Sequence, residues 1–195
     1  TAPAFQENSP QLVEIDEDRG LQDFSLPLTV SDINGGLLTW TILAQAQNGS
    51  ASIEDTTANT REIYYRSNDH YHGNDTFVVQ VTDAQGLTAQ LTINVTINPV
   101  NDFPAGSLAI VGEAIDGNTL SVEDRLTDAD GIGSRSYQWF DDGDTLLAEG
   151  GSYILSKADV FKDIHVKASY LDNDGTLETV NSGDVTVTFI ADADY

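Results

Sequence analysis

The chain has 195 residues, which suffices for one large domain or for two domains of about 100 residues each. It is 39% hydrophobic, enough to bury a core, and its 32 acidic against 8 basic side chains give a net charge of −24. That charge repels nucleic-acid phosphates and anionic lipid surfaces, and the absence of cysteine excludes disulfides, thiolate catalysis and cysteine-ligated zinc.

Apolar and polar residues alternate along much of the chain with the period of two that is typical of half-buried β-strands. In chain order the apolar members of these runs are Leu26, Leu28 and Val30; Leu38, Trp40 and Ile42; Phe77, Val79 and Val81; Leu91, Ile93, Val95 and Ile97; Ile164, Val166, Ala168 and Tyr170; and Val185, Val187 and Phe189. Turn sequences such as Asn48-Gly49 and Asp174-Gly175 separate them. Because there is no helical periodicity and no apolar run of about 18 residues, we predict an all-β fold without membrane insertion.

A proline-containing segment divides the chain near its middle. The strand that ends at Ile97 cannot continue as a central strand through Pro99 and Pro104. A similar segment, residues 1–5, stands one sandwich-domain length earlier. The sequence therefore predicts two tandem Greek-key β-sandwich domains, residues 1–102 and 103–195. The chain begins at Thr1 rather than at methionine, so we expect it to be a segment of a longer protein.

Acidic loops are predicted to gather where the two domains join. Antiparallel strands place successive loops at alternate ends of a sandwich, so some loops of the first domain share its C-terminal end and some of the second share its N-terminal end. The candidate metal ligands of these loops are Glu17, Asp18, Asp69, Asn101, Asp102, Asp128, Asp130, Asp172 and Asp174. Ca²⁺ takes about 6–8 oxygen ligands in adaptable geometry and would relieve their repulsion.

Plain turn chemistry is the alternative, because Asp, Asn and Gly are favoured in turns whether or not an ion is bound. Both alternatives also stay open for the acids at the outward ends of the two domains. These acids are Asp32, Asp83, Glu113, Asp116, Asp192 and Asp194.

The first half resembles a cadherin-like tandem repeat of bacterial giant adhesins. The residues that carry this resemblance are Asp16-Glu17-Asp18, Ser31-Asp32, Asn48-Gly49-Ser50, 71–77, 81–86 and the exit segment 100–104. In that family the acidic turns and the exit segment hold calcium. The resemblance therefore implies Glu17, Asp69, Asn101 and Asp102 as ligands, joined by Asp128 and Asp130.

The second half is similar to the bacterial immunoglobulin-like repeats of the same giant, type I-secreted RTX proteins. The matching stretches are 117–120, 128–131, 137–139, 142–143, 153–155, 158–160 and 169–172. One departure is Phe161, where the family pattern leads us to expect glycine. The two resemblances together imply a cadherin-like domain at 1–102 and a bacterial immunoglobulin-like domain at 103–195.

The expected function is that of a calcium-binding structural or adhesion segment in a large secreted or surface bacterial adhesin, with Ca²⁺ making the interdomain junction rigid. The expected partners are neighbouring repeats of the same chain and a cell-surface glycan or adhesin, with no nucleic acid. The alternative is a carbohydrate- or protein-binding module, including one accessory to a secreted polysaccharide-degrading enzyme.

Catalytic and other metal chemistry finds little support in the residues. His70 and His72 share a strand-like face, but they stand in a turn sequence and only His165 is left elsewhere, whereas zinc takes three or four ligands. We interpret them as turn residues. The abundant acids lie in short turns rather than across a cleft, and no Gly-x-Ser-x-Gly motif is present, so we expect no enzyme.

Aromatic residues offer candidate sugar-binding platforms. Trp40 and Trp139 lie in alternating runs and are predicted to be core residues rather than platforms. The expected exposed candidates are Tyr64, Tyr65 and Tyr71.

Overall fold

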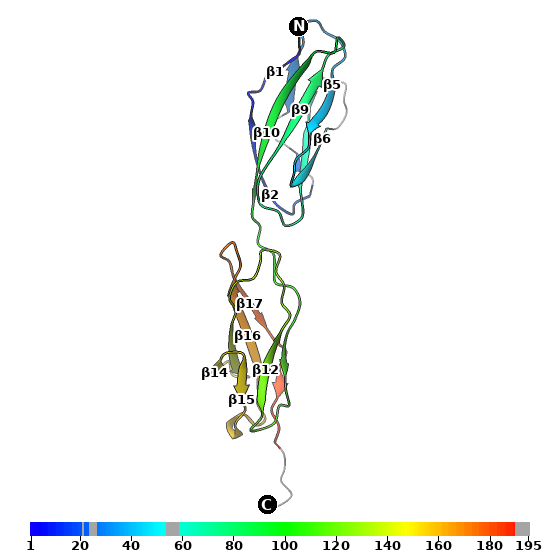
Figure 1. Cartoon of the computed structure of the whole chain (residues 1–195). Helices are drawn as coiled ribbons and strands as arrows, with labels where there is room; N and C mark the ends of the chain where they lie inside the picture. Colours follow the sequence, from blue (N-terminus) through cyan, green and yellow to red (C-terminus); the bar gives the residue numbers. More distant parts are fainter. Residues whose placement is uncertain (21, 24–26, 54–58, 190–195) are drawn as a thin grey trace, which may run out of the picture. The chain divides into compact units, whose positions relative to one another are not determined.

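The computed structural model describes residues 1–20, 22–23, 27–53 and 59–189, so Leu26, Asp192 and Asp194 lie outside the described residues. The chain divides into two compact units, Thr1–Val100 (unit 1) and Asn101–Tyr195 (unit 2), with the division two residues before the expected boundary. Figure 1 shows strands throughout both units. The described residues include a 3₁₀ turn and no α-helix, which confirms the all-β prediction. None of their helical segments has the length and apolar character needed to cross a membrane.

Unit 1 is a β-sandwich. One layer is a four-stranded sheet in the order β2-β10-β9-β5, and the facing strands form two three-stranded sheets, β1-β4-β7 and β3-β8-β6. The strands are β1 (Ala4–Phe5), β2 (Gln11–Asp16), β3 (Gln22–Asp23), β4 (Leu28–Ser31), β5 (Thr39–Ala44), β6 (Gly49–Ile53), β7 (Thr60–Arg61), β8 (Ile63–Ser67), β9 (Gly73–Thr82) and β10 (Thr88–Asn98).

The alternation of β9 and β10 explains the core of unit 1. In their antiparallel register Ile93 stands opposite Phe77 and Leu91 opposite Val79, and all four are at most 1% exposed. Trp40 is 2% exposed and lies edge-to-face against Phe5, with ring centroids 5.6 Å apart, so its predicted core role is confirmed. Burial of these apolar strand faces away from water is the main contribution to the stability of the fold.

One aromatic prediction is wrong. Tyr65 is fully buried rather than exposed, and its ring stacks on Phe77 at 5.9 Å. Tyr64 and Tyr65 are consecutive residues of β8, and consecutive strand residues point to opposite faces, so the two could not both be surface platforms.

Unit 2 is a second sandwich, made of a sheet β11-β12-β15 and a sheet β14-β13-β16-β17 in which β18 also pairs with β16. Trp139, in β13, is fully buried at the centre of its core, as predicted. The elements are β11 (Leu108–Val111), β12 (Thr119–Asp124), β13 (Ser136–Asp141), β14 (Leu146–Glu149), β15 (Ser152–Ile154), a 3₁₀ turn (Lys157–Asp159), β16 (Asp163–Leu171), β17 (Leu177–Asn181) and β18 (Val185–Thr186).

The last predicted run ends early. Val187 is fully buried, but Phe189 is 52% exposed and lies edge-to-face against Phe161. The reason is a change of neighbour: β18 pairs with β16 only through Thr186, after which Thr188 bridges to Ile115. Phe161 adopts φ +69, a conformation that favours glycine, which explains why the family pattern led us to expect glycine there.

The sheets bring the acidic turns together at one end of each unit. In unit 1, β2 pairs in parallel with β10, with Asp16 opposite Asn98, so both strands finish at the same end. The connection from β8 to β9 turns at that end too, because β9 runs antiparallel to β10. In unit 2 the turn at 128–131 meets the turn between β16 and β17, where the Asn173 N–H donates to the Asp130 carbonyl at 3.1 Å.

Candidate metal centre

Glu17 is the buried acid at the C-terminal end of unit 1. It follows β2, and its backbone N–H donates to the Asn98 carbonyl at 3.1 Å, which extends the β2–β10 pairing by one residue. Its side chain is 0% exposed, and Oε1 accepts the Val100 N–H at 2.9 Å. Oε2 is buried with no hydrogen-bond partner among the residues that the structure describes. A buried carboxylate with an unsatisfied oxygen is costly, so this position favours a positive partner.

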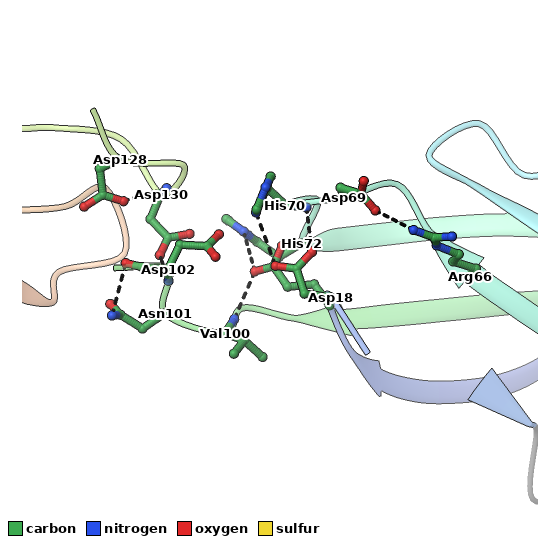
Figure 2. Close-up of polar contacts among 11 residues, drawn as sticks. Asp18, Arg66, Asp69, His70, His72, Val100, Asn101, Asp102, Asp128 and Asp130 are labelled. Carbon is green, nitrogen blue, oxygen red and sulfur yellow. Dashed lines mark hydrogen bonds and ion pairs between the residues drawn. The ribbon is translucent and has the colours of Figure 1, made fainter. Parts of the chain in front are cut away.

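Asp18 and two histidines complete this end of unit 1, as Figure 2 shows. Asp18 Oδ1 accepts the backbone N–H of His70 at 2.9 Å, and Asp18 Oδ2 lies 3.3 Å from His70 Nδ1. His72 Nδ1 lies 3.5 Å from Glu17 Oε1. Two carboxylates and two imidazoles from turns about 52 residues apart in sequence therefore share one end of the sandwich.

Asp69 does not join this group. Its carboxylate accepts from Arg66 at 2.8 Å, and its side chain is 71% exposed (Figure 2). The structure thus places Glu17 and Asp18 together in unit 1 and leaves the third expected ligand of this unit in an exposed ion pair.

The N-terminal end of unit 2 holds an acidic cluster, formed by two turns. Asp130 is 7% exposed and Asp172 is 6% exposed. Asp128 Oδ1 accepts the Asp130 N–H at 3.0 Å, and Asp128 Oδ2 accepts the Tyr170 hydroxyl at 2.6 Å. Asp172 Oδ1 accepts the Thr176 N–H at 2.7 Å, whereas Asp172 Oδ2 is buried without a hydrogen-bond partner in the described part of the chain.

The first residues of unit 2 close onto this cluster. The Asp102 N–H donates to Asp130 Oδ2 at 2.6 Å, and Asn101 Nδ2 donates to Glu178 Oε1 at 2.9 Å. Glu178 is itself buried. These contacts connect Asp102 and Asp128 to Asp130, and Asn101 to Glu178. Asp172 is buried in the adjoining turn and Asp174 is exposed there.

The electrostatics of the cluster reflect its crowding. Burial raises the pKa of Asp130, and the nearby carboxylates of Asp102, Asp128 and Asp174 raise it further, against the lowering effect of the Asp102 N–H. Burial and the hydrogen bond to Asp128 raise the pKa of Tyr170 as well. Ionised Asp130 is thus disfavoured by its own surroundings, and a bound cation would reverse that preference.

Oxygen atoms alone make up the side-chain donor set of the unit 2 cluster. Carboxylate and amide oxygens suit Ca²⁺, whose variable coordination fits side chains from separate loops better than the strict octahedron of Mg²⁺. The unpartnered Asp172 Oδ2 offers a buried acceptor with nothing to accept from, which is the feature that a cation would satisfy.

Sequence reasoning missed four residues at these two ends. Tyr170 and Glu178 belong to the unit 2 cluster, and His70 and His72, interpreted as turn residues, contact the acids of unit 1. The strand alternation could have indicated Glu178, because it lies on the same inward face of β17 as Val180. Nothing in the sequence indicated that the histidines contact acids, because those acids lie far away in the sequence.

At the outward end of unit 1, turn chemistry is visible. Asp83 Oδ1 accepts the N–H groups of Gln85 at 2.9 Å and Leu87 at 2.8 Å, and Asp32 Oδ1 accepts the Asn34 N–H at 3.1 Å. These contacts stabilise the turns in the way that Asp residues do in many proteins. Asp83 Oδ2 and Asp32 Oδ2 are nevertheless buried without a hydrogen-bond partner among the described residues, so both alternatives stay open at this end.

Comparison with protein-family models finds a similarity in the first half of the chain. Residues 1–96 match the family model described as a bacterial Ig domain. The match covers a little under half of the chain and is a similarity of unit 1 to that family. The resemblance drawn from the sequence assigned the cadherin-like type to this half and the bacterial Ig-like type to the other, so the repeat type of unit 2 stays a prediction. Glu17 and Asp18 lie inside the matched residues, and Val100 lies just after them.

Solved structures support the same architecture. The chain is similar to mouse Cadherin-23 EC22-24 (TM-score 0.55, 19% identity, 99% of this chain and 68% of that one) and to human CDH23 EC21-23 (0.53, 16%, 93% and 62%). It is also similar to protocadherin gamma B7 extracellular cadherin domains 1-4 (0.52, 17%, 95% and 49%), of which it spans about half. At these identities the similarity shows the tandem-sandwich fold alone. No curated protein matches the chain.

Proposed function

We propose that the chain is a non-catalytic, calcium-binding structural and adhesion segment of a large secreted or surface adhesin. The observation that carries this proposal is the unit 2 cluster, in which Asp130 and Asp172 are more than nine-tenths buried and Asp172 Oδ2 has no hydrogen-bond partner among the described residues. Bacterial Ig-like domains are typically extracellular or at the cell surface, and the Ig-like and cadherin-like family is typically non-enzymatic.

The contacts of the connecting residues suggest how calcium would act. Val100 donates to Glu17 within unit 1, and Asp102 donates to Asp130 within unit 2. Calcium at these acids would neutralise them and hold both ends of the connection, so the connection would become stiffer and harder to cleave. Binding to the folded state alone stabilises by about 2.7 kcal/mol at a ligand concentration one hundred times Kd.

Neighbouring repeats of the same chain are the partners in this proposal, together with a cell-surface glycan or an adhesin. Calcium would transmit force along the repeats by fixing the connections between them. The buried positions of Trp40 and Trp139 leave sugar stacking on tryptophan out of the adhesion step.

Calorimetric titration and thermal unfolding test the calcium site directly. We expect saturable Ca²⁺ binding and a Tm rise of roughly 10 °C over the chain in EDTA, since about 2.7 kcal/mol corresponds to a shift of that order. Asp172→Asn should weaken binding at least tenfold. Asp130→Asn should lose the calcium-dependent rise yet be no less stable than the wild type in EDTA, because it removes a charge that burial disfavours and keeps an oxygen for the Asp102 N–H.

Asp184→Asn is the matched control, because its side chain is 65% exposed and lies 3.5 Å from His165 rather than in the cluster. It should bind calcium as the wild type does. An absence of binding at millimolar Ca²⁺, or an equal Tm rise in wild type and Asp172→Asn, would refute the proposal.

A further inference from the structure

Unit 2 carries a pocket at the edge of its sandwich, where the chain crosses from one sheet to the other. Strand β14 ends at Glu149, and Gly150-Gly151 lead to β15 in the facing sheet, so the two strands lie side by side (Figure 1). The pocket has a volume of about 480 Å³, and its lining includes Arg135, Tyr137, Gln138, Glu149 and the two glycines. We propose that this pocket binds a neutral sugar unit of a polysaccharide. The adhesive role of such a site rests on the proposed function, whereas its residues are separate from those of the calcium cluster.

Two glycines keep the pocket open. Among the described residues, a Cβ atom at Gly150 or at Gly151 would meet no atom within 4 Å apart from its chain neighbours, so the space beside this backbone is unfilled. Gly150 has φ +111, which favours glycine, whereas the φ of Gly151 is not positive. The Gly150 N–H donates to the Tyr137 carbonyl at 2.9 Å, and the Gly150 carbonyl accepts the Trp139 indole N–H at 2.9 Å. These bonds hold the crossing backbone in place, so the pocket is a fixed feature of the fold.

A pair of polar side chains borders the pocket on β13 and β14. Gln138 stands opposite Glu149 in the strand register, and its Nε2 donates to Glu149 Oε1 at 3.1 Å. That bond orients both side chains and occupies one oxygen of the carboxylate. The other carboxylate oxygen and the amide carbonyl of Gln138 can then accept hydrogen bonds from the hydroxyl groups of a sugar.

Asp124 holds two further side chains of the pocket. The Tyr137 hydroxyl donates to Asp124 Oδ2 at 2.7 Å, and Arg135 Nε lies 3.1 Å from the same oxygen. Arg135 Nη2 also donates to the Leu126 carbonyl at 3.2 Å, and Tyr137 is partly buried against the core of unit 2. The ring therefore offers a fixed apolar surface for the C–H face of a sugar, and the remaining N–H groups of the guanidinium can donate to its hydroxyls. Groups that are already held in place lower the ordering cost of binding.

The charges of the pocket favour a neutral ligand. Asp124 neutralises the Arg135 guanidinium, which leaves the exposed carboxylate of Glu149 as the net charge of the lining. An anionic polysaccharide would be repelled by that carboxylate and by the net charge of −24 of the chain. A neutral polysaccharide meets no such repulsion.

The size and lining of the pocket favour a sugar over a peptide. Small-molecule sites occupy about 300–1,000 Å³ and combine aromatic surface with a few fixed polar groups, and this pocket falls within that range. Protein partners instead anchor large aromatic or aliphatic side chains in desolvated pockets. Here four polar side chains line the pocket beside the ring, which suits a ligand that is rich in hydroxyl groups.

Native gel electrophoresis in the presence of polysaccharide tests this site. The full chain is run through gels that contain a neutral β-glucan, galactomannan or xylan, or the anionic polysaccharide alginate, and calorimetry then measures the affinity for any that retards it. We expect at least one neutral polysaccharide to retard the chain and alginate to leave it unretarded. Glu149→Ala and Gly151→Leu should each weaken binding about tenfold or more, because one removes an acceptor and the other fills the space beside the backbone.

Two variants outside the pocket are matched controls. Glu113→Ala removes another exposed glutamate of unit 2, and Gly183→Leu adds a side chain at another glycine whose Cβ would have open space around it. Both should bind polysaccharide as the wild type does. Glu149→Ala and Gly151→Leu should keep the wild-type Tm, which separates loss of the pocket from loss of folding; Gln138→Ala provides a further variant of the same edge.

Three results would overturn the site. These are no retardation by the neutral polysaccharides, stronger retardation by alginate than by any of them, or an affinity that stays unchanged in both Glu149→Ala and Gly151→Leu. Binding of casein, an unfolded polypeptide, that Gly151→Leu abolishes would identify a peptide site instead. Asp172→Asn should bind polysaccharide in EDTA as the wild type does, so failure of this site and failure of the calcium site give different results.

Discussion

At the scale of single residues, the buried acids fall into two groups that their hydrogen bonds distinguish. Asp159 is 2% exposed, and its Oδ2 accepts from the Tyr153 hydroxyl, the Ser156 N–H and the Ser156 hydroxyl. Such a carboxylate is satisfied by the fold and stabilises it. Glu17 and Asp172 each keep one buried oxygen without a partner in the described residues. A ligand could satisfy an oxygen of this kind, and Glu7, Asp32 and Asp83 each keep one as well.

Asp141 belongs to the satisfied group and gives a pH-dependent prediction. The Thr145 N–H and the Lys162 ammonium donate to it, and together they lower the pKa of Asp141 to about 2. A lowered pKa means that its contribution to stability is present above the ordinary value of 3.8 and is lost as pH falls towards about 2. We expect Asp141→Asn to lower Tm at pH 7, with the gap to the wild type closing between pH 4 and pH 2.

Thermal unfolding monitored by circular dichroism across that pH range checks this. Asp142→Asn changes the exposed acid next to it and is the control, with a Tm close to wild type throughout. A gap that stays constant from pH 7 to pH 2 would show that the ionised carboxylate is not the stabilising form.

At the scale of elements, strands β6 and β8 illustrate a close approach that only glycine permits. Gly49 opens β6 opposite Ser67, and a Cβ atom there would lie 2.3 Å from the Tyr65 hydroxyl and 2.4 Å from the Arg66 carbonyl. Tyr65 cannot move aside, because it is fully buried and its hydroxyl donates to Asp75 at 2.8 Å. The Asn-Gly pair predicted a turn, but the glycine also serves the packing of two strands.

Gly49→Ala should therefore destabilise unit 1 by about 1–3 kcal/mol through overpacking against backbone and a locked ring. Chemical denaturation measures the change. Gly183→Ala is the matched control, since nothing lies within 4 Å of a Cβ at that position, and it should change stability by less than about 0.5 kcal/mol. Equal stabilities for the two variants would contradict the close approach.

At the scale of the whole molecule, charge is the dominant property. A net charge of −24 opposes compaction and opposes the approach of one acidic surface to another. Each unit concentrates part of this charge at one end, around Glu17 in unit 1 and around Asp130 and Asp172 in unit 2. Divalent cations would neutralise these ends far more effectively than screening by dilute salt does.

Small-angle scattering tests the mechanical part of the proposed function. In EDTA the chain should show a broad distribution of interatomic distances, and added Ca²⁺ should lengthen its maximum dimension and narrow that distribution. Asp172→Asn should behave in Ca²⁺ as the wild type does in EDTA. A scattering profile that calcium leaves unchanged, with binding shown by calorimetry, would limit calcium to stabilising the units themselves.

The sequence by itself determined the all-β class, the division near residue 100, the core tryptophans and the acidic turns. These follow from local patterns: a period of two, a proline-containing segment, and glycine or acid in turns. Strand direction also predicted that Glu17 and Asp18 lie at the end where the chain leaves unit 1, and that the turns at 128–131 and 172–175 meet.

Only the tertiary structure decided which acids find hydrogen-bond or ion-pair partners for their carboxylate oxygens and which do not. Asp69 forms an exposed ion pair with Arg66. Glu17, which is likewise an acid in a turn segment, is buried beside His72. The parallel pairing of β2 with β10 produces that burial, and it joins residues more than eighty positions apart. Hydrogen bonding, burial and pKa depend on neighbours that are close in space and distant in the chain, so no local pattern of residues could have shown them.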